Sequence, residues 1–183
     1  MKIRVAFILT CLLGILILLN PSAHAETFNM GQYRLGSGDV IKVTVYGQGD
    51  LSLETRLPDT GIINYPFLGD IKAVGMTAAQ LENAIYLGLK GDYLVNPSIS
   101  VSIVEYRPFF IDGEIKKPGG YPYQPGLSVD KAAAVAGGYT QRAAKDNIKI
   151  LREINGVQKE LSPVKTSDTV LPGDIVRVQQ SFF

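Results

Sequence analysis

The alternation of apolar and polar residues predicts short strands in both halves of the chain. Residues 40–46 are rich in β-branched residues and apolar on both faces, which favours a strand. In residues 99–104, isoleucine and valine alternate with serine, a pattern typical of a strand with one buried and one polar face. The remaining predicted strands are 62–63, 71–74, 109–111, 147–154, 157–161 and 175–178.

A helix is predicted after the first group of strands. Thr77 is a good N-cap residue, and Gln80 stands three positions later, which completes a capping box. Apolar residues then recur every four positions, at Leu81, Ile85 and Leu89. This spacing places them on one face of the helix, which should pack on the sheet.

A second, alanine-rich helix is predicted at residues 129–136. Ser128 is its expected N-cap, and the pair Gly137-Gly138 should end it, because glycine readily adopts the left-handed conformation that closes a helix. Small alanine side chains allow such a helix to pack closely on a sheet. Each half of the chain thus has strands and one helix, so we expect an α+β fold of two small domains.

One short motif occurs twice and predicts two similar turns. Gly38-Asp39 and Gly173-Asp174 are each followed by two apolar residues, a basic residue and valine. Glycine allows the turn, and the aspartate side chain can accept hydrogen bonds from nearby backbone N–H groups. We therefore assign structural roles to both aspartates, with a loss of about 0.5–2 kcal/mol on replacement by alanine.

Two further turns are predicted from their residue types. Asp59 and Gly61 lie between the first strands, and Pro118-Gly119 follows the strand at 109–111. Proline presets one backbone angle of a turn, and glycine permits the other. Structural roles are expected for all four residues.

The boundary between the domains is expected at residues 105–108. This segment is short and rich in neither glycine nor serine, so the domains should pack together instead of moving freely. The predicted division is 26–105 for the first domain and 106–183 for the second.

The first 25 residues resemble a secretory signal peptide. Lys2 and Arg4 precede an uncharged run at 7–19, and small residues occupy the A-x-A positions that end at Ala25. The run is shorter than the ~20 apolar residues that a membrane span needs. We expect cleavage between Ala25 and Glu26.

A lipoprotein signal is an alternative interpretation of this segment. Cys11 follows an apolar stretch, but Thr10 is a poor residue before a lipidated cysteine. Cys11 also lies inside the apolar run and not at its end. We therefore expect no lipid anchor.

Cleavage would leave 158 of the 183 residues, with 16 basic and 17 acidic side chains and a net charge of −1. No basic cluster remains, which argues against nucleic acid as a partner. The chain's single cysteine, Cys11, and its single histidine, His24, would both be lost. Disulfides, His or Cys metal sites and histidine-dependent triads are thereby excluded from the mature chain.

Catalysis would therefore depend on carboxylates, lysine or tyrosine. A glycosidase needs two carboxylates, and the candidates are Asp39, Asp59, Asp70, Asp112, Glu114 and Asp174. Four of these stand beside or near glycine, where capping of a turn is the usual role. Asp112 and Glu114 are two positions apart on one strand face, without neighbours that suggest a raised pKa. We predict no catalytic, metal or cofactor site.

Tyr121 and Tyr123 are candidate contacts for a saccharide. They stand two positions apart, so they would lie on one face of a strand. Flat aromatic rings can stack on sugar rings. The alternative, which we favour, is ordinary packing of tyrosine at a half-buried surface.

Several stretches resemble the outer-membrane polysaccharide export family. In the first half these are YRLGSGDV at 33–40, LPDTGI at 57–62, YPFLG at 65–69, VGMT at 74–77 and NPSISV at 96–101. In the second half, GEIKKPG at 113–119 and AGGY at 136–139 resemble a soluble-ligand-binding β-grasp domain. Each fragment alone is a turn signature, and their order and spacing carry the resemblance.

The resemblance implies a periplasmic, outer-membrane-associated component of a capsular or exopolysaccharide export machine, without enzymatic activity. Its implied partners are polysaccharide, an inner-membrane polysaccharide co-polymerase, a separate outer-membrane barrel and further copies of itself in a ring. The chain stops five residues after Val178, so it resembles short members without the C-terminal membrane-spanning helix. The alternatives are a periplasmic saccharide-binding protein and, more remotely, a glycan-processing enzyme.

Overall fold

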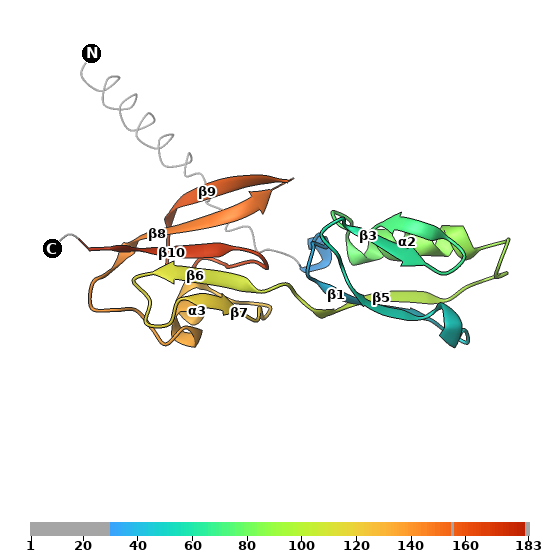
Figure 1. Cartoon of the computed structure of the whole chain (residues 1–183), viewed down its shortest axis with the longest axis horizontal. Coiled ribbons are helices and arrows are strands. Elements are labelled where there is room, and N and C mark those ends of the chain that lie inside the picture. Colours follow the sequence, from blue (N-terminus) through green and yellow to red (C-terminus); the bar gives the residue numbers. More distant parts are fainter. Residues whose placement is uncertain (1–29, 155, 182–183) are drawn as a thin grey trace, which may run out of the picture.

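The computed structural model describes residues 30–154 and 156–181. The predicted leader and its cleavage position between Ala25 and Glu26 lie outside the described residues. Two domains follow one another along the long axis of the molecule, and a short linker joins them (Figure 1). Each domain has its own buried apolar core, and the partly buried Tyr106 packs against both.

The first domain is a three-stranded sheet with a hairpin and a helix. The sheet has the order β2-β1-β5, and both strand pairs are antiparallel. The separate hairpin pairs β3 with β4. The elements are β1 (Val40–Val45), β2 (Leu53–Arg56), β3 (Ile62–Tyr65), β4 (Gly69–Lys72), α2 (Ala78–Leu89) and β5 (Ile99–Glu105), with short 3-10 turns at Met30–Gln32 and Gly49–Leu51.

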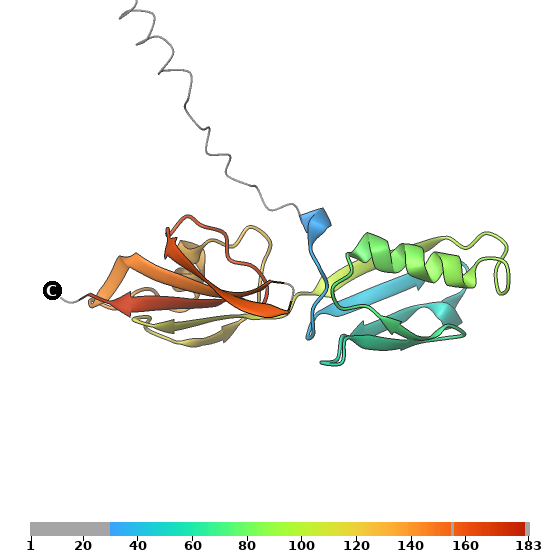
Figure 2. The same cartoon turned by 90° about the horizontal axis from the view of Figure 1, so that it is seen from above.

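The helix α2 forms where the sequence predicts it. The Thr77 side chain accepts a hydrogen bond from the Gln80 N–H, and the Gln80 side chain accepts one from the Thr77 N–H, so the capping box is confirmed. The predicted apolar face is fully buried at Leu81, Ile85 and Leu89. This face packs the helix along the sheet of β1 and β5 (Figure 2).

The second domain is a five-stranded sheet with one short helix. Its strand order is β7-β6-β10-β8-β9, in which β6 and β10 are parallel and the other pairs antiparallel. The elements are β6 (Phe109–Gly113), β7 (Gly119–Tyr121), α3 (Val129–Val135), β8 (Ala143–Ile154), β9 (Val157–Val164) and β10 (Ile175–Gln180). The fold is β-grasp-like, and the expected α+β class is confirmed.

The helix α3 lies in the core of this domain through its small residues. Val129, Ala132 and Ala133 are fully buried. The Ser128 side chain accepts a hydrogen bond from the Lys131 N–H, as an N-cap residue does. The helix ends at Val135, one residue earlier than predicted, with Ala136 as its C-cap and two glycines after it.

One strand was missed and another begins earlier than predicted, because tertiary pairing creates them. The strand β2 pairs with β1 and has alternating half-buried and exposed side chains, but its charged residues Glu54 and Arg56 hide the strand in the sequence. In β7 the chain is extended from Gly119, where the sequence predicts a turn, because Gly119 and Gly120 pair with Ile111 and Phe110. Propensity alone cannot find strands whose stability comes from a partner strand.

Within residues 30–154 and 156–181, each helix is too short or too polar to cross a bilayer.

Candidate functional site

The two Gly-Asp motifs build the same turn in the two domains. An oxygen of Asp39 accepts a 2.7 Å hydrogen bond from the N–H of Gly36, and an oxygen of Asp174 accepts one of 2.7 Å from the N–H of Leu171. The backbone N–H of each aspartate also donates to the carbonyl of the same residue, to Gly36 at 3.2 Å and to Leu171 at 3.1 Å. Both carboxylates are buried, with 0% and 1% of their residues exposed.

Each turn leads into a central strand of its sheet. Asp39 directly precedes β1, which lies between β2 and β5, and Asp174 directly precedes β10, which lies between β6 and β8. The turns therefore fix where the central strand of each domain begins.

Asp39 also binds the linker between the domains. Its Oδ1 accepts a 2.7 Å hydrogen bond from the backbone N–H of Arg107, and the Tyr33 hydroxyl lies 2.8 and 3.0 Å from its two oxygens. The Arg107 guanidinium is 3.5 Å away and bonds the Tyr33 hydroxyl at 3.0 Å. Burial, and then the Asp39 charge, raise the pKa of Tyr33 well above its ordinary value.

Asp174 is held by a different arginine. The Nε and Nη2 atoms of Arg152 donate to its two oxygens at 2.9 and 2.7 Å. This bidentate geometry gives strong, oriented hydrogen bonds. A further bond of 3.0 Å from Nη2 to the Thr169 carbonyl ties the strand β8 to the segment before the turn.

The Arg107 side chain lies between the two turns. A Cβ atom added to Gly36 would stand 1.6 Å from Nη1 of Arg107, and one added to Gly173 would stand 2.6 Å from its Nε. The absence of side chains at these two glycines, one in each domain, leaves the space that the arginine fills. Gly173 also has a φ of 84°, which disfavours other residues there.

The linker backbone is bonded to the second domain as well. The N–H of Gly173 donates to the Pro108 carbonyl at 3.1 Å, and the N–H of Phe110 donates to the Asp174 carbonyl at 2.8 Å. The linker thus bonds the first turn through Arg107 and the second through Pro108.

Three tyrosine rings run across the same junction. The ring of Tyr106 lies edge-on to Tyr33 of the first domain at 5.2 Å and edge-on to Tyr123 of the second at 5.4 Å. Such edge-to-face pairs stabilise by about 0.5–1.5 kcal/mol each beyond their buried area. Burial raises the pKa of both Tyr106 and Tyr123. We take the junction of these rings, Arg107 and the two turns as the candidate functional site, hereafter the junction.

The other predicted turn residues lie away from the junction. Asp59 is exposed in the turn that the Gly61 N–H closes onto the Pro58 carbonyl. Pro118 precedes β7 in the loop after β6. Gly137 and Gly138 end α3 with bonds from their N–H groups to Ala134 and Ala133.

The structure separates the two candidate saccharide contacts. Tyr123 is 6% exposed and lies in the core beside Tyr106, so its ring faces are not available to a sugar. Tyr121 is half-buried, its ring stacks near Phe109 at 6.0 Å, and its hydroxyl donates to the Lys117 carbonyl. The expected shared strand face does not form because β7 ends at Tyr121.

The candidate carboxylates are likewise dispersed. Asp112 pairs with Arg177 on β10, and Glu114, which follows β6, accepts a hydrogen bond from Thr140. Asp70 accepts one from Asn64 across the β3–β4 hairpin. In the described part of the chain, no three His, Cys, Asp or Glu side chains gather as metal ligands would.

Sequence reasoning found the two aspartates but missed the residues that join them to the linker. Tyr33, Tyr106, Arg107 and Arg152 had no assigned role. Their contacts span large separations, such as 68 positions between Asp39 and Arg107. The available signal was the position of Tyr106-Arg107 in a linker without glycine or serine.

The fold and the junction define a protein of two small α+β domains whose linker is hydrogen-bonded to both. Residues 29–104 match a family described as polysaccharide biosynthesis/export protein, and residues 108–159 match the SLBB domain. The chain belongs to the polysaccharide export family, which is a family of export proteins and not of enzymes.

Curated relatives agree with this assignment. The exopolysaccharide production protein ExoF of Rhizobium meliloti is 32% identical over 146 residues, covering 69% of this chain and 34% of ExoF. The EPS I polysaccharide export outer membrane protein EpsA of Ralstonia nicotianae is 26% identical over 182 residues, covering 81% of this chain and 47% of EpsA. The chain thus spans between a third and a half of the length of these relatives.

Proposed function

We propose that this protein is a component of a capsular or exopolysaccharide export machine and acts as a conduit or adaptor. The observation that carries the proposal is the match of both domains, in order, to the domains of the export family. The relatives named for exopolysaccharide production and export support it.

The junction supports a structural role for the chain. A closed ring of identical subunits needs each subunit to present its surfaces at a constant angle. Tyr106 contacts rings from both domains, and Arg107 occupies space left by glycines of both turns. The two domains therefore present one composite surface, which suits repeated side-by-side contacts.

The proposed partners follow from this role. We infer that copies of the chain form a ring that encloses the path of the polysaccharide. The ring would connect an inner-membrane polysaccharide co-polymerase to a separate outer-membrane barrel, and the protein would lie in the periplasm against the outer membrane. We propose no chemical step for it.

The processed form of the chain is a first test. We expect cells to secrete it and to cleave it after Ala25, so that mass spectrometry of the periplasmic fraction gives an unlipidated chain beginning at Glu26. A diacylglyceryl group on Cys11 would contradict this expectation.

Deletion and complementation in the native host test the function itself. Loss of the gene should abolish extracellular polysaccharide while intracellular polymer still forms, and the intact gene should restore export. Normal secretion without the gene would reject the proposal. Light scattering of the processed chain, alone and with extracts of inner- and outer-membrane partners, should show an assembly of several subunits.

The alternative is a periplasmic saccharide-binding protein without a transport role. A chain that stays monomeric under all these conditions and binds polysaccharide while export persists without it would favour that alternative.

A further inference from the structure

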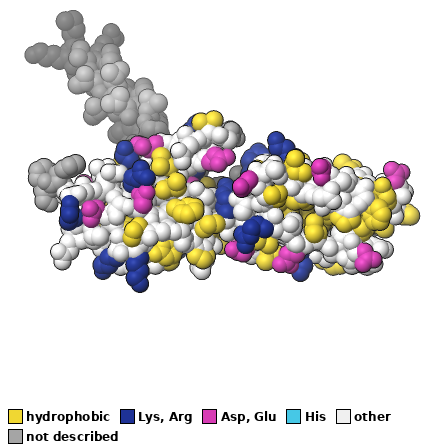
Figure 3. Space-filling model, in the orientation of Figure 1, with side chains coloured by type: hydrophobic (Ala, Val, Ile, Leu, Met, Phe, Trp, Pro, Cys, Tyr) yellow, Lys and Arg dark blue, Asp and Glu magenta, His cyan; other side chains and the backbone are white. Residues whose placement is uncertain are grey.

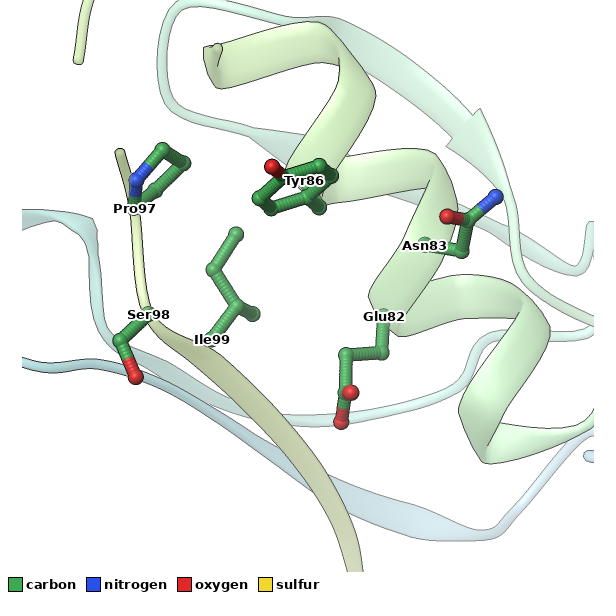
Figure 4. A pocket seen from close by; sticks show the side chains of 6 residues that line it. All are labelled: Glu82, Asn83, Tyr86, Pro97, Ser98 and Ile99. Atoms are coloured by element: carbon green, nitrogen blue, oxygen red, sulfur yellow. The ribbon is translucent and has the colours of Figure 1, made fainter. Parts of the chain in front are cut away.

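An open groove lies on the first domain, far from the junction. It runs between the helix α2 and the start of β5 and has a volume of about 310 Å³. Figure 4 shows Glu82 and Tyr86 on the helix side, Pro97 and Ser98 on the strand side, and Ile99 between them. The sixth lining residue, Asn83, lies on the outer part of the helix side.

The lining combines flat apolar surfaces with hydrogen-bonding groups. The tyrosine ring of Tyr86 and the proline ring of Pro97 face the same space from opposite sides (Figure 4). Ile99 adds a half-buried apolar surface below them. The Tyr86 and Ser98 hydroxyls can both donate and accept, as can the amide of Asn83.

Glu82 is a fixed acceptor at one end of the groove. One of its carboxylate oxygens, Oε2, accepts a 3.1 Å hydrogen bond from the backbone N–H of Val101 on β5. This bond orients the side chain and leaves the other oxygen for a donor from outside. A charged acceptor forms stronger hydrogen bonds with hydroxyl groups than a neutral one does.

The charge of the groove restricts its ligand. Glu82 carries the single formal charge among the six lining residues. Lys90, outside the lining, has its ammonium 5.1 Å from the centre of the Tyr86 ring, so the Glu82 charge is balanced at the edge of the groove. A cation would find one carboxylate without companion ligands. The arrangement fits a neutral, hydroxyl-rich ligand with an apolar face, which is the chemistry of a sugar ring.

The open shape of the groove indicates how such a ligand would bind. Its volume is near the lower end of the ~300–1,000 Å³ that is usual for ligand sites. It is open to solvent along one side and does not enclose its contents. An open groove of this kind can hold a short part of a longer polymer.

We propose that the groove of Glu82, Tyr86 and Ser98 binds a short neutral segment of the exported polysaccharide. The inference rests on the proposed function for the identity of the polymer. A sugar ring lies between Tyr86 and Pro97, and its hydroxyls donate to Glu82 and bond Ser98. The site would give the chain weak affinity for the polymer that it passes on.

A second exposed aromatic surface supplies the matched control. Phe67 and Tyr93 lie in the same domain, 67% and 47% exposed, with ring centres 5.0 Å apart. Neither residue lines the groove. Tyr93→Ala removes a tyrosine ring, as Tyr86→Ala does, but leaves the six lining residues of the groove unchanged.

Binding of purified polysaccharide fragments tests the inference. The probe is the extracellular polysaccharide of the native host, cut to four to eight sugars, titrated into the isotope-labelled, processed chain and followed by amide NMR shifts. We expect shifts at residues 82–86 and 98–101 in the parent. Tyr86→Ala should weaken binding about fivefold to tenfold, whereas Tyr93→Ala should leave it unchanged.

Glu82→Gln refines the assignment. The glutamine oxygen can still accept the Val101 N–H, so the variant keeps its fold and loses the charge. We expect binding about threefold weaker than in the parent, because a neutral acceptor replaces a charged one. Unchanged binding by both Tyr86→Ala and Glu82→Gln would overturn the proposal.

The remaining outcomes separate the groove from the function. Shifts centred on Phe67, or lost binding in Tyr93→Ala alone, would place the sugar elsewhere and overturn the proposal. Absence of shifts at millimolar fragment, with export still dependent on the gene, would reject the groove and leave the export role standing. Export that does not depend on the gene would reject the export role, whatever the fragments bind.

Discussion

Replacement of Asp39 tests how the junction is held together. The carboxylate accepts 2.7 Å bonds from the N–H groups of Gly36 and Arg107, and it bonds the Tyr33 hydroxyl at 2.8 Å. Asp39→Ala would leave these donors without a partner in a fully buried position. A buried unsatisfied donor costs about 1–3 kcal/mol, and loss of one member of a buried charged pair about 3–5 kcal/mol.

We therefore expect Asp39→Ala to lower the free energy of unfolding by about 3–5 kcal/mol. This exceeds the loss of about 0.5–2 kcal/mol expected from the sequence, which was based on the loss of a capping group. Asp39→Asn is the sharper variant because it has the same shape. Its amide group must face one of the two backbone N–H donors, so we expect a loss of about 2 kcal/mol.

Urea denaturation measures these losses. The chain has no tryptophan, so circular dichroism and tyrosine fluorescence are the probes. Asp59→Asn is the matched control: Asp59 is exposed in a turn of the same domain, and its replacement should change stability by less than about 0.5 kcal/mol. If Asp39→Asn were as stable as this control, the hydrogen-bond geometry at Asp39 could not be what holds the turn.

Three further predictions concern the same junction. The pKa of Tyr33 is raised above its ordinary value of 10.0, so the stability that its hydroxyl contributes should be complete below pH 10 and be lost at higher pH. The difference in unfolding free energy between the parent and Tyr33→Phe, measured by urea denaturation, should therefore become smaller from pH 8 to pH 11. Gly173→Ala should destabilise more than Gly156→Ala, since both glycines have positive φ but the added Cβ meets an arginine only at Gly173; equal thermal shifts would contradict this. Tyr106→Ala should loosen the angle between the domains in small-angle scattering and residual dipolar couplings, whereas the exposed Tyr46→Ala should not.

The sequence predicted the features of the fold that depend on local signals. The capping box and the spacing of Leu81, Ile85 and Leu89 identify α2 because three residues and their neighbours suffice to define a helix face. The Gly-Asp motif identified both turns because the aspartate accepts from a backbone N–H three positions earlier.

The features that escaped prediction depend on distant parts of the chain. The strand β7 begins at two glycines that were predicted to form a turn, and they are extended because they pair with β6. The place of Arg107 between two glycines that stand 137 positions apart follows from how both domains fold, and no local pattern encodes it. The burial of Tyr123 has the same origin, since Tyr106 covers it from the linker.

Because the motif is repeated, the junction influences the structure of both domains. Asp39 and Asp174 each start a central strand, and the linker of Tyr106, Arg107 and Pro108 contacts both turns. A change in the linker therefore disturbs the start of β1 and of β10 together. In an assembly of many copies, a small change of the angle between the domains would be repeated in every subunit and would prevent closure of a ring. Variants of Tyr106 that keep the stability of the parent should accordingly still lose assembly and export. This result would separate the role of the junction in the machine from its role in the fold.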